Sequence, residues 1–164
     1  VEKFPSQEYF IGNLMDYYIQ KGKIDEGLAQ MDAVLAKNST PYFMYVKGVL
    51  QYEKKDYEGA IATFNQIIAE GKDFVAEAYS KIGDCSFFPA QEIVEENSKL
   101  SMDDPKYAAN EAKIKELYEK ALPFYEKAKE AKPDNRQLWG QYLLNIYWKL
   151  DKEKYNALEK ELGY

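Results

Sequence analysis

The 164-residue sequence contains no histidine and only one cysteine. Catalytic systems that need a histidine base are therefore excluded, and so are tetrahedral zinc sites built from cysteine and histidine. A single cysteine cannot close a disulfide bond within the chain. Because Cys85 lies in an apolar stretch with helical periodicity, we predict that it is a small core residue rather than a redox centre.

Basic clusters and long apolar runs are missing as well. The chain has 22 Lys and Arg against 28 Asp and Glu, a net charge of −6, and acids are interleaved with its basic residues. This pattern predicts no nucleic-acid partner. No run reaches the roughly 18 apolar residues of a membrane helix, so no membrane span is predicted in this chain. The chain begins at Val1 without a charged-then-apolar leader, so we interpret it as a mature or truncated piece.

Paired carboxylates are the remaining candidates for catalysis or metal binding, and their spacing argues against both. Glu95 and Glu96 are adjacent in the sequence, and adjacent residues on a helix do not face one another. Asp103 and Asp104 lack the spaced oxygen ligands and the glycine of a calcium loop. We therefore predict a protein that is not an enzyme and that needs no cofactor or metal.

Helical periodicity dominates the rest of the sequence. Apolar residues recur at intervals of three and four in the stripe Ile61, Phe64 and Ile67, and again over residues 114–128. We find no sustained alternation of apolar and polar residues that would indicate strands. The fold class predicted from these patterns is all-α.

Helix boundaries are marked by capping residues and prolines. Thr40-Pro41 and Asp104-Pro105 each combine an N-cap side chain with a proline in the first turn. Residues 132–135 are predicted to end one helix and to cap the next.

The helices recur as a repeat. Gly27 aligns with Ala60 and Met31 with Phe64, each at an offset of 33 residues. This offset approximates one helix-turn-helix unit.

The aligned residues carry a family resemblance. The tetratricopeptide repeat has the pattern W-x2-L-G-x2-Y, then A-x3-F, then P, with a period of 34. Here Gly48 is followed by Ala60-x3-Phe64, and Gly83 by Ala121-x3-Tyr125. The chain thus resembles that family, which implies a single domain over residues 1–164: a right-handed α-solenoid of about four helix pairs. The implied repeats span residues 8–40, 41–74, 76–135 and 136–164, the last being a C-terminal capping pair.

The third repeat is longer than the pattern requires. From Gly83 to Ala121 there are 38 residues, against 12 from Gly48 to Ala60, so 26 are extra. We place this insertion at approximately residues 89–116 and expect a helical hairpin. Pro89 and Pro123 fall inside helical runs and are expected to bend or interrupt them.

A narrower resemblance concerns residues 121–128, which read A-L-P-F-Y-E-K-A. Tetratricopeptide proteins of the Bacteroidetes type carry a similar segment after a long insertion. That resemblance implies that this chain is the C-terminal part of a longer array, with an unknown number of repeats before Val1. Because members are often exported, it also implies the periplasm or cell envelope as the location.

The resemblance further implies a scaffold that binds a peptide or partner helix in a concave groove lined by the first helix of each pair. The family's inward places in the first two repeats correspond to Tyr9, Gly12, Asp16, Ile19, Gln20, Tyr42, Tyr45, Val49, Tyr52 and Glu53. The candidate partner-binding residues in this groove are Tyr42, Tyr45, Tyr52, Asp84, Phe87, Tyr147 and Trp148. The negative charge of Asp16 would repel a C-terminal carboxylate, which argues against a site that clamps one.

Three alternatives remain open at this level. In the first, the groove aromatics pack between repeats and bind no partner. In the second, they stack on the sugar rings of a glycan, and the chain is a glycan- or nutrient-binding accessory protein of the bacterial cell envelope. Homo-oligomer formation through an apolar N-terminal end is the third, and its residues are Phe4, Tyr9, Phe10 and Tyr17.

Overall fold

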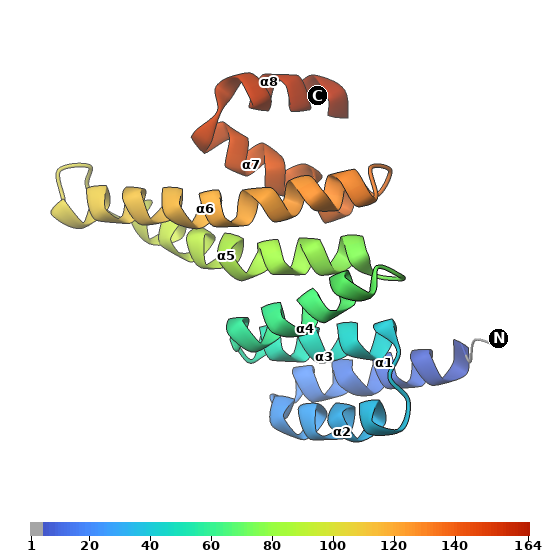
Figure 1. Ribbon diagram of the computed structural model, residues 1–164. Helices are drawn as coiled ribbons and strands as arrows, with labels where there is room; N and C mark the ends of the chain where they lie inside the picture. The colour runs from blue at the N-terminus through green and yellow to red at the C-terminus, as the bar shows by residue number, and fades with distance from the viewer. Residues whose placement is uncertain (1–4) are drawn as a thin grey trace. The chain divides into compact units, whose positions relative to one another are not determined.

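The computed structural model describes the backbone of residues 5–164 and the side chains of residues 9–164. The helices are α1 (Pro5–Gln20), α2 (Ile24–Lys37), α3 (Pro41–Glu53), α4 (Tyr57–Glu70), α5 (Val75–Asn97), α6 (Pro105–Ala131), the 3₁₀ turn η1 (Arg136–Leu138), α7 (Gly140–Leu150) and α8 (Lys152–Leu162) (Figure 1). These residues contain no strand, which confirms the all-α fold class. None of the described helices combines the length and apolar character that a membrane crossing needs.

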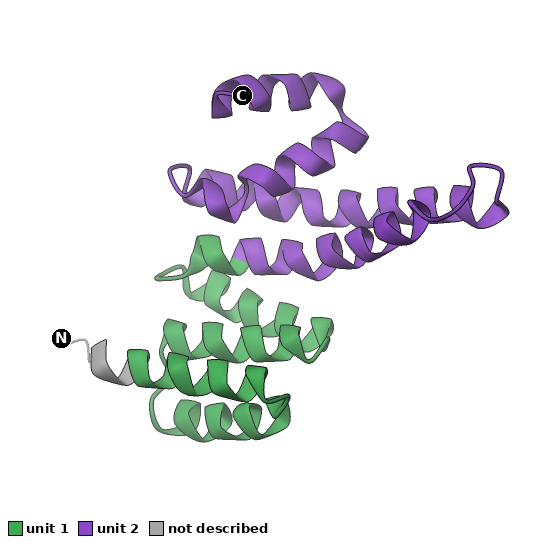
Figure 2. Ribbon diagram, turned by 180° about the vertical axis from the view of Figure 1, so that it is seen from behind, with its two compact units in different colours: residues 1–78 green, residues 79–164 purple. Residues whose placement is uncertain are grey.

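The chain divides into two compact units, residues 1–78 and residues 79–164, which Figure 2 shows in different colours. Unit 1 consists of two antiparallel helix pairs, α1 with α2 and α3 with α4. In the second pair, Gly48 of α3 lies against the ring of Phe64 of α4, and the hydroxyl of Thr63 donates a 2.6 Å hydrogen bond to Gln51. The consecutive helix pairs expected of an α-solenoid are therefore present in this unit.

The helix ends in unit 1 follow the capping residues. The hydroxyl of Thr40 accepts a 3.2 Å hydrogen bond from the backbone N–H of Phe43, and Pro41 is the first residue of α3. Gly71 ends α4 with a φ of 64°, a left-handed conformation that glycine adopts without steric cost. These contacts span three residues or fewer, so they depend on local sequence alone.

Unit 2 begins with a long antiparallel pair. α5 has 23 residues and α6 has 27, against 13 to 16 in the helices of unit 1, which confirms that the third pair is enlarged. The helices continue through Pro89 and Pro123, so neither proline interrupts its helix. Asp104 caps α6 by accepting a 2.8 Å hydrogen bond from the N–H of Lys106, as its sequence predicts.

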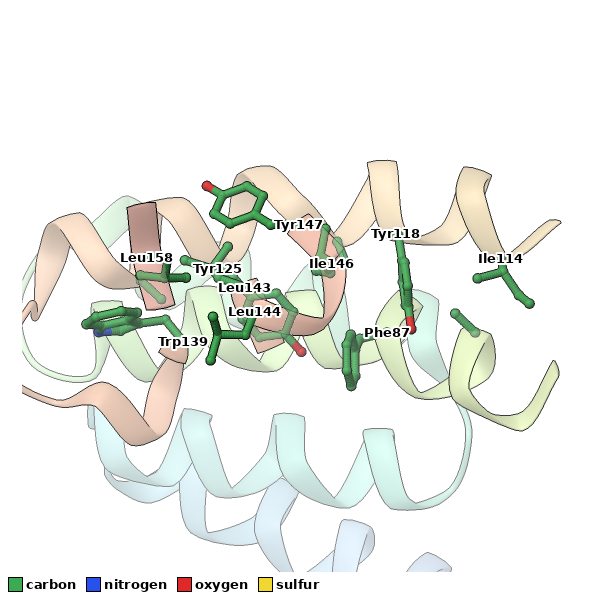
Figure 3. Packing of buried hydrophobic residues seen from close by; sticks show 13 residues of the cluster. Phe87, Ile114, Tyr118, Tyr125, Trp139, Leu143, Leu144, Ile146, Tyr147 and Leu158 are labelled. Carbon is green, nitrogen blue, oxygen red and sulfur yellow. The ribbon is translucent and has the colours of Figure 1, made fainter. Parts of the chain in front are cut away.

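Contacts between α5 and α6 run along the whole pair. Near the start of α5, Gly83 lies against the ring of Tyr125. In the middle, the rings of Phe87 and Tyr118 stack with centroids 5.6 Å apart (Figure 3). Because rising numbers on α5 meet falling numbers on α6, the two helices are antiparallel.

The core of unit 2 joins this long pair to α7 and α8. Its large buried side chains include Phe87, Ile114, Tyr118, Tyr125, Trp139, Leu143, Leu144, Ile146, Tyr147 and Leu158 (Figure 3). They come from all four helices and from Trp139, which precedes α7. Burial of these aromatic and branched side chains is the main force that holds the unit together.

One predicted boundary is wrong. Residues 132–135 were expected to cap the next helix, but Asn135 makes no side-chain cap hydrogen bond and leads into the short turn η1. The helix itself begins five residues later, at Gly140. The reason is tertiary: Trp139 is buried in the core of unit 2, and its indole N–H donates a 3.3 Å hydrogen bond to the carbonyl of Lys132. Burying this ring outweighs the local preference for an earlier helix start.

Candidate functional site

A hollow of about 260 Å³ lies between α1 and α3 in unit 1. Its lining consists of Gly12, Met15, Asp16, Ile19, Tyr42, Tyr45, Val46, Val49 and Leu50. The residues from α3 recur at intervals of three and four, so they share one face of the helix. The hollow therefore brings together the first helices of two consecutive pairs, and six of its residues occupy the inward places that the family resemblance implied.

Aromatic contacts hold the two tyrosines of the hollow in position. The ring of Tyr45 stacks on Phe74 with centroids 5.4 Å apart, and the ring of Tyr42 lies 5.8 Å from the same phenylalanine. On the opposite wall, a Cβ added to Gly12 would lie only 2.8 Å from the hydroxyl oxygen of Tyr42. The missing side chain at Gly12 thus makes room for the Tyr42 hydroxyl.

The hollow combines an apolar floor with acidic edges. Met15 and Leu50 are buried at its base. Asp16 is exposed beside them and makes no ion pair with any residue that the structure describes. Glu53 continues the same α3 stripe beyond Leu50 and is also exposed. This arrangement suits a ligand with an apolar part and a positive charge.

Tyr52, also predicted for the groove, lies on α3 outside this lining. Its ring is half-buried, 5.7 Å from that of Tyr57.

Three predicted groove residues lie in the interior of unit 2. Asp84 is buried and accepts a 2.7 Å hydrogen bond from the Tyr125 hydroxyl. Phe87 is buried in the aromatic cluster, and Tyr147 is almost fully buried, donating a 2.7 Å hydrogen bond to Glu126. Burial, followed by the Glu126 carboxylate, raises the pKa of the Tyr147 phenol. These three side chains pack within the unit, and a role for them in partner binding stays a prediction.

Trp148 is the fourth predicted groove residue of unit 2 and is 59% exposed on α7. It borders a second cavity, of about 390 Å³, formed by α5, α6 and α7. This cavity is lined by Gln91, Val94, Asn97, Ser98, Tyr107, Glu111, Ile114, Tyr118, Asn145, Trp148 and Lys149. Sequence reasoning missed every lining residue except Trp148, because most of them belong to the insertion, which has no counterpart in the repeat pattern.

The carboxylate pairs considered for catalysis have structural partners. Glu95 pairs with Lys99 at 2.9 Å, and Glu96 pairs with Lys106. The lysine partners lower the pKa of both glutamates, chiefly through these hydrogen bonds. Among the described side chains, no three His, Cys, Asp or Glu residues gather in a way that would hold a metal ion.

Cys85 is buried in unit 2, as predicted, and its sulfur lies 3.3 Å from the carbonyl oxygen of Lys81. Burial, together with the neighbouring Asp84, raises the pKa of its thiol to about 12. Because the thiolate is the reactive form, we expect alkylation by iodoacetamide at mildly alkaline pH to be on the order of 10³-fold slower than in urea-unfolded chain. Mass spectrometry of timed samples measures both rates. Equal rates in the folded and unfolded chains would show that this thiol is accessible and ionised.

The predicted self-association surface falls partly on described residues. Tyr9, Phe10 and Tyr17 on α1 are exposed, whereas Phe4 lies outside the described residues. Homo-oligomer formation through this face stays a prediction.

Residues 13–73 match the family model of the tetratricopeptide repeat, and this range covers the second half of α1 and all of α2, α3 and α4. No curated protein and no solved structure matches the chain. Residues 13–73, which form antiparallel helix pairs with small residues at their contacts, are therefore similar to the tetratricopeptide repeat.

Proposed function

We propose that this chain is a non-catalytic scaffold and that the hollow between α1 and α3 binds a peptide or helix of a partner protein. Tetratricopeptide repeats generally mediate protein–protein interactions. The observation that carries the finer proposal is the hollow itself, because it lies on the first helices of two consecutive pairs and all of its lining residues except Gly12 fall within the matched segment.

The chemistry of the hollow indicates the kind of peptide. Tyr42 and Tyr45 are rigid aromatic side chains, which bury a large area at a low cost in conformational entropy. The apolar floor at Met15 and Leu50 suits a leucine, isoleucine or phenylalanine of the partner. The carboxylate of Asp16 suits a neighbouring lysine or arginine. The proposed ligand is therefore a short segment with apolar and basic residues side by side.

This composition favours a peptide over a sugar at the same place. Met15, Ile19, Val46, Val49 and Leu50 supply no side-chain hydrogen-bond donors or acceptors, and a sugar ring would have to lose water from its hydroxyl groups there. An apolar side chain gains from the same burial. In unit 1, the hollow therefore supports the peptide proposal rather than the glycan alternative.

A phage-displayed library of short random peptides tests this assignment. We expect the full chain to enrich peptides that place Lys or Arg next to Leu, Ile or Phe. Asp16→Lys should weaken a selected peptide about tenfold or more, because attraction becomes repulsion, and Tyr45→Ala should weaken it by a similar factor. Fluorescence anisotropy with the labelled peptide measures the affinities.

The matched control is Glu58→Lys, which reverses an exposed charge on α4 outside the hollow. With this variant, peptide affinity should stay within about twofold of that of the original chain, because only a screened long-range attraction is lost. If the selected peptides bind Asp16→Lys and Tyr45→Ala as tightly as the original chain, their site is elsewhere and the proposal is wrong.

A further inference from the structure

The cavity of unit 2 is a place where three helices meet around polar side chains. The end of α5, the first half of α6 and the second half of α7 each contribute to its lining. Its volume of about 390 Å³ falls in the usual range for small-ligand sites, roughly 300–1,000 Å³. All its residues belong to unit 2, so what it binds does not depend on the peptide site proposed for unit 1.

Asn97 in the cavity lining has an unsatisfied hydrogen-bond acceptor. This residue is buried, with only 5% of its surface exposed. Its amide nitrogen donates to the carbonyl of Tyr107 at 3.3 Å and to the carboxylate of Glu111 at 3.2 Å. Its amide oxygen has no partner among the described residues.

The orientation of this amide follows from its neighbours. Turning it over would place the oxygen of Asn97 against the Tyr107 carbonyl and the Glu111 carboxylate, which are both acceptors. The oxygen is therefore left without a donor by the fold itself. Because a buried polar atom without a partner is unfavourable, a donor that reached this oxygen from the adjoining cavity would be stabilised there.

The charges of the lining indicate a neutral ligand. Among the described residues that line the cavity, Glu111 and Lys149 carry charge, and they form an ion pair with one another. The carboxylate of Glu111 also accepts the hydrogen bond from Asn97. Within the lining, a charged ligand would therefore meet no unpaired opposite charge, and it would lose its own hydration on entry.

The uncharged groups of the lining match hydroxyl groups. Gln91 donates a hydrogen bond to the Tyr118 hydroxyl, and the Ser98 hydroxyl donates to the carbonyl of Glu95. The Tyr118 hydroxyl can still donate, the oxygens of Gln91 and Ser98 can accept, and the amide of Asn145 can do both. A sugar ring carries hydroxyls, which also donate and accept, on most of its carbon atoms. A peptide backbone offers only one donor and one acceptor per residue. The density of polar groups in this small space therefore favours a sugar ring over a peptide segment.

Trp148 supplies the flat apolar surface on which the C–H face of a sugar ring can lie. Its side chain remains 59% exposed, although the ammonium group of Lys152 lies over its ring. On these grounds we propose that the cavity between α5, α6 and α7 binds a neutral sugar ring, with Asn97 accepting a hydrogen bond from a ring hydroxyl and Trp148 packing against the ring face. The ring comes either from a free monosaccharide or from the end of a glycan chain.

Saturation-transfer-difference NMR and calorimetric titration of the full chain test this proposal. The probes are glucose, galactose, mannose, N-acetylglucosamine and neutral gluco- and manno-oligosaccharides. We expect saturation of ring C–H protons for at least one of them. A monosaccharide that binds as tightly as its oligomer identifies a free sugar as the source, whereas a tighter oligomer identifies a glycan end.

Two variants assign the binding to this cavity. Trp148→Ala and Asn145→Ala should each lower sugar affinity about tenfold, while their circular dichroism stays that of the original chain. Both residues are exposed, so these variants avoid removing a buried side chain such as Asn97. The matched controls are Tyr164→Ala and Asn156→Ala, which remove exposed side chains of the same kinds outside the lining and should leave the affinity unchanged.

Failure of this proposal is distinguishable from failure of the peptide site. Asp16→Lys should retain sugar binding, and Trp148→Ala should retain peptide binding. Absence of binding for every probe at millimolar concentration overturns the sugar assignment, as does unchanged affinity in both cavity variants. If instead the selected peptides lose affinity in Trp148→Ala and Asn145→Ala, the cavity takes a peptide and not a sugar.

Discussion

Replacing Tyr125 by alanine is expected to lower the free energy of unfolding of unit 2 by about 3–5 kcal/mol, the usual cost of deleting a buried aromatic ring. The ring is fully buried and stacks on Tyr142 with centroids 4.6 Å apart. Its hydroxyl donates to the buried carboxylate of Asp84. The substitution therefore opens a cavity and also leaves Asp84 with Lys81, at 2.8 Å, as its remaining side-chain partner.

Tryptophan fluorescence during urea unfolding measures this effect, because both tryptophans of the chain, Trp139 and Trp148, lie in unit 2. Tyr125→Phe keeps the ring and removes only the hydroxyl, so we expect an intermediate loss of about 1.5–3 kcal/mol. Tyr164→Ala, at an exposed position, should change stability by less than about 0.5 kcal/mol. Equal losses for Tyr125→Phe and Tyr125→Ala would show that ring packing contributes nothing beyond the hydrogen bond.

In unit 1, the largest loss is expected from Gly48→Leu, at about 3 kcal/mol. A Cβ at Gly48 would lie 2.6 Å from Cε1 and 2.7 Å from Cζ of Phe64, closer than any real contact. Phe64 is fully buried, so its ring has no free space to enter. The two helices of the pair must then move apart, which loses contacts along both of them.

Far-UV circular dichroism follows this loss, since unit 1 contains no tryptophan. Gly140→Ala is the control, because the nearest atom to a Cβ there is 3.7 Å away, and we expect a change within about 0.5 kcal/mol. A second test combines Gly48→Ala with Phe64→Leu. The double variant should be more stable than the sum of the single losses predicts, because a smaller side chain makes room for the new methyl group. Strict additivity would contradict the steric interpretation.

The parts of the fold that the sequence predicts well are those set by local contacts. Thr40 and Asp104 cap their helices through hydrogen bonds to residues three and two positions on. The prediction of where α7 starts was wrong because this start depends on Trp139, whose buried ring packs in the core of unit 2. Distant packing of this kind leaves no signature in a short stretch of residues.

The candidate site also has one part that the sequence predicts and another part that depends on distant packing. Around Gly12, Asp16, Tyr42 and Tyr45 the two pairs have ordinary lengths, so inward places carried over from the family meet around one hollow. In unit 2 the side chains of Asp84, Phe87 and Tyr147 are buried, and only Trp148 among the predicted residues is exposed. The residues that meet in the second cavity could not be predicted from the sequence, because contacts such as that between residues 111 and 149 join segments 38 positions apart.

Both units contain a glycine that makes room for a buried aromatic ring of the partner helix. Gly48 receives the ring of Phe64, and Gly83 receives the ring of Tyr125, although far more chain separates the second couple. The residues of the insertion therefore lengthen α5 and α6 beyond the contact between Gly83 and Tyr125. Because this contact does not depend on the length of the helices beyond it, residues can be added to or removed from the outer end of the α5–α6 hairpin without altering the packing of Tyr125 against Gly83.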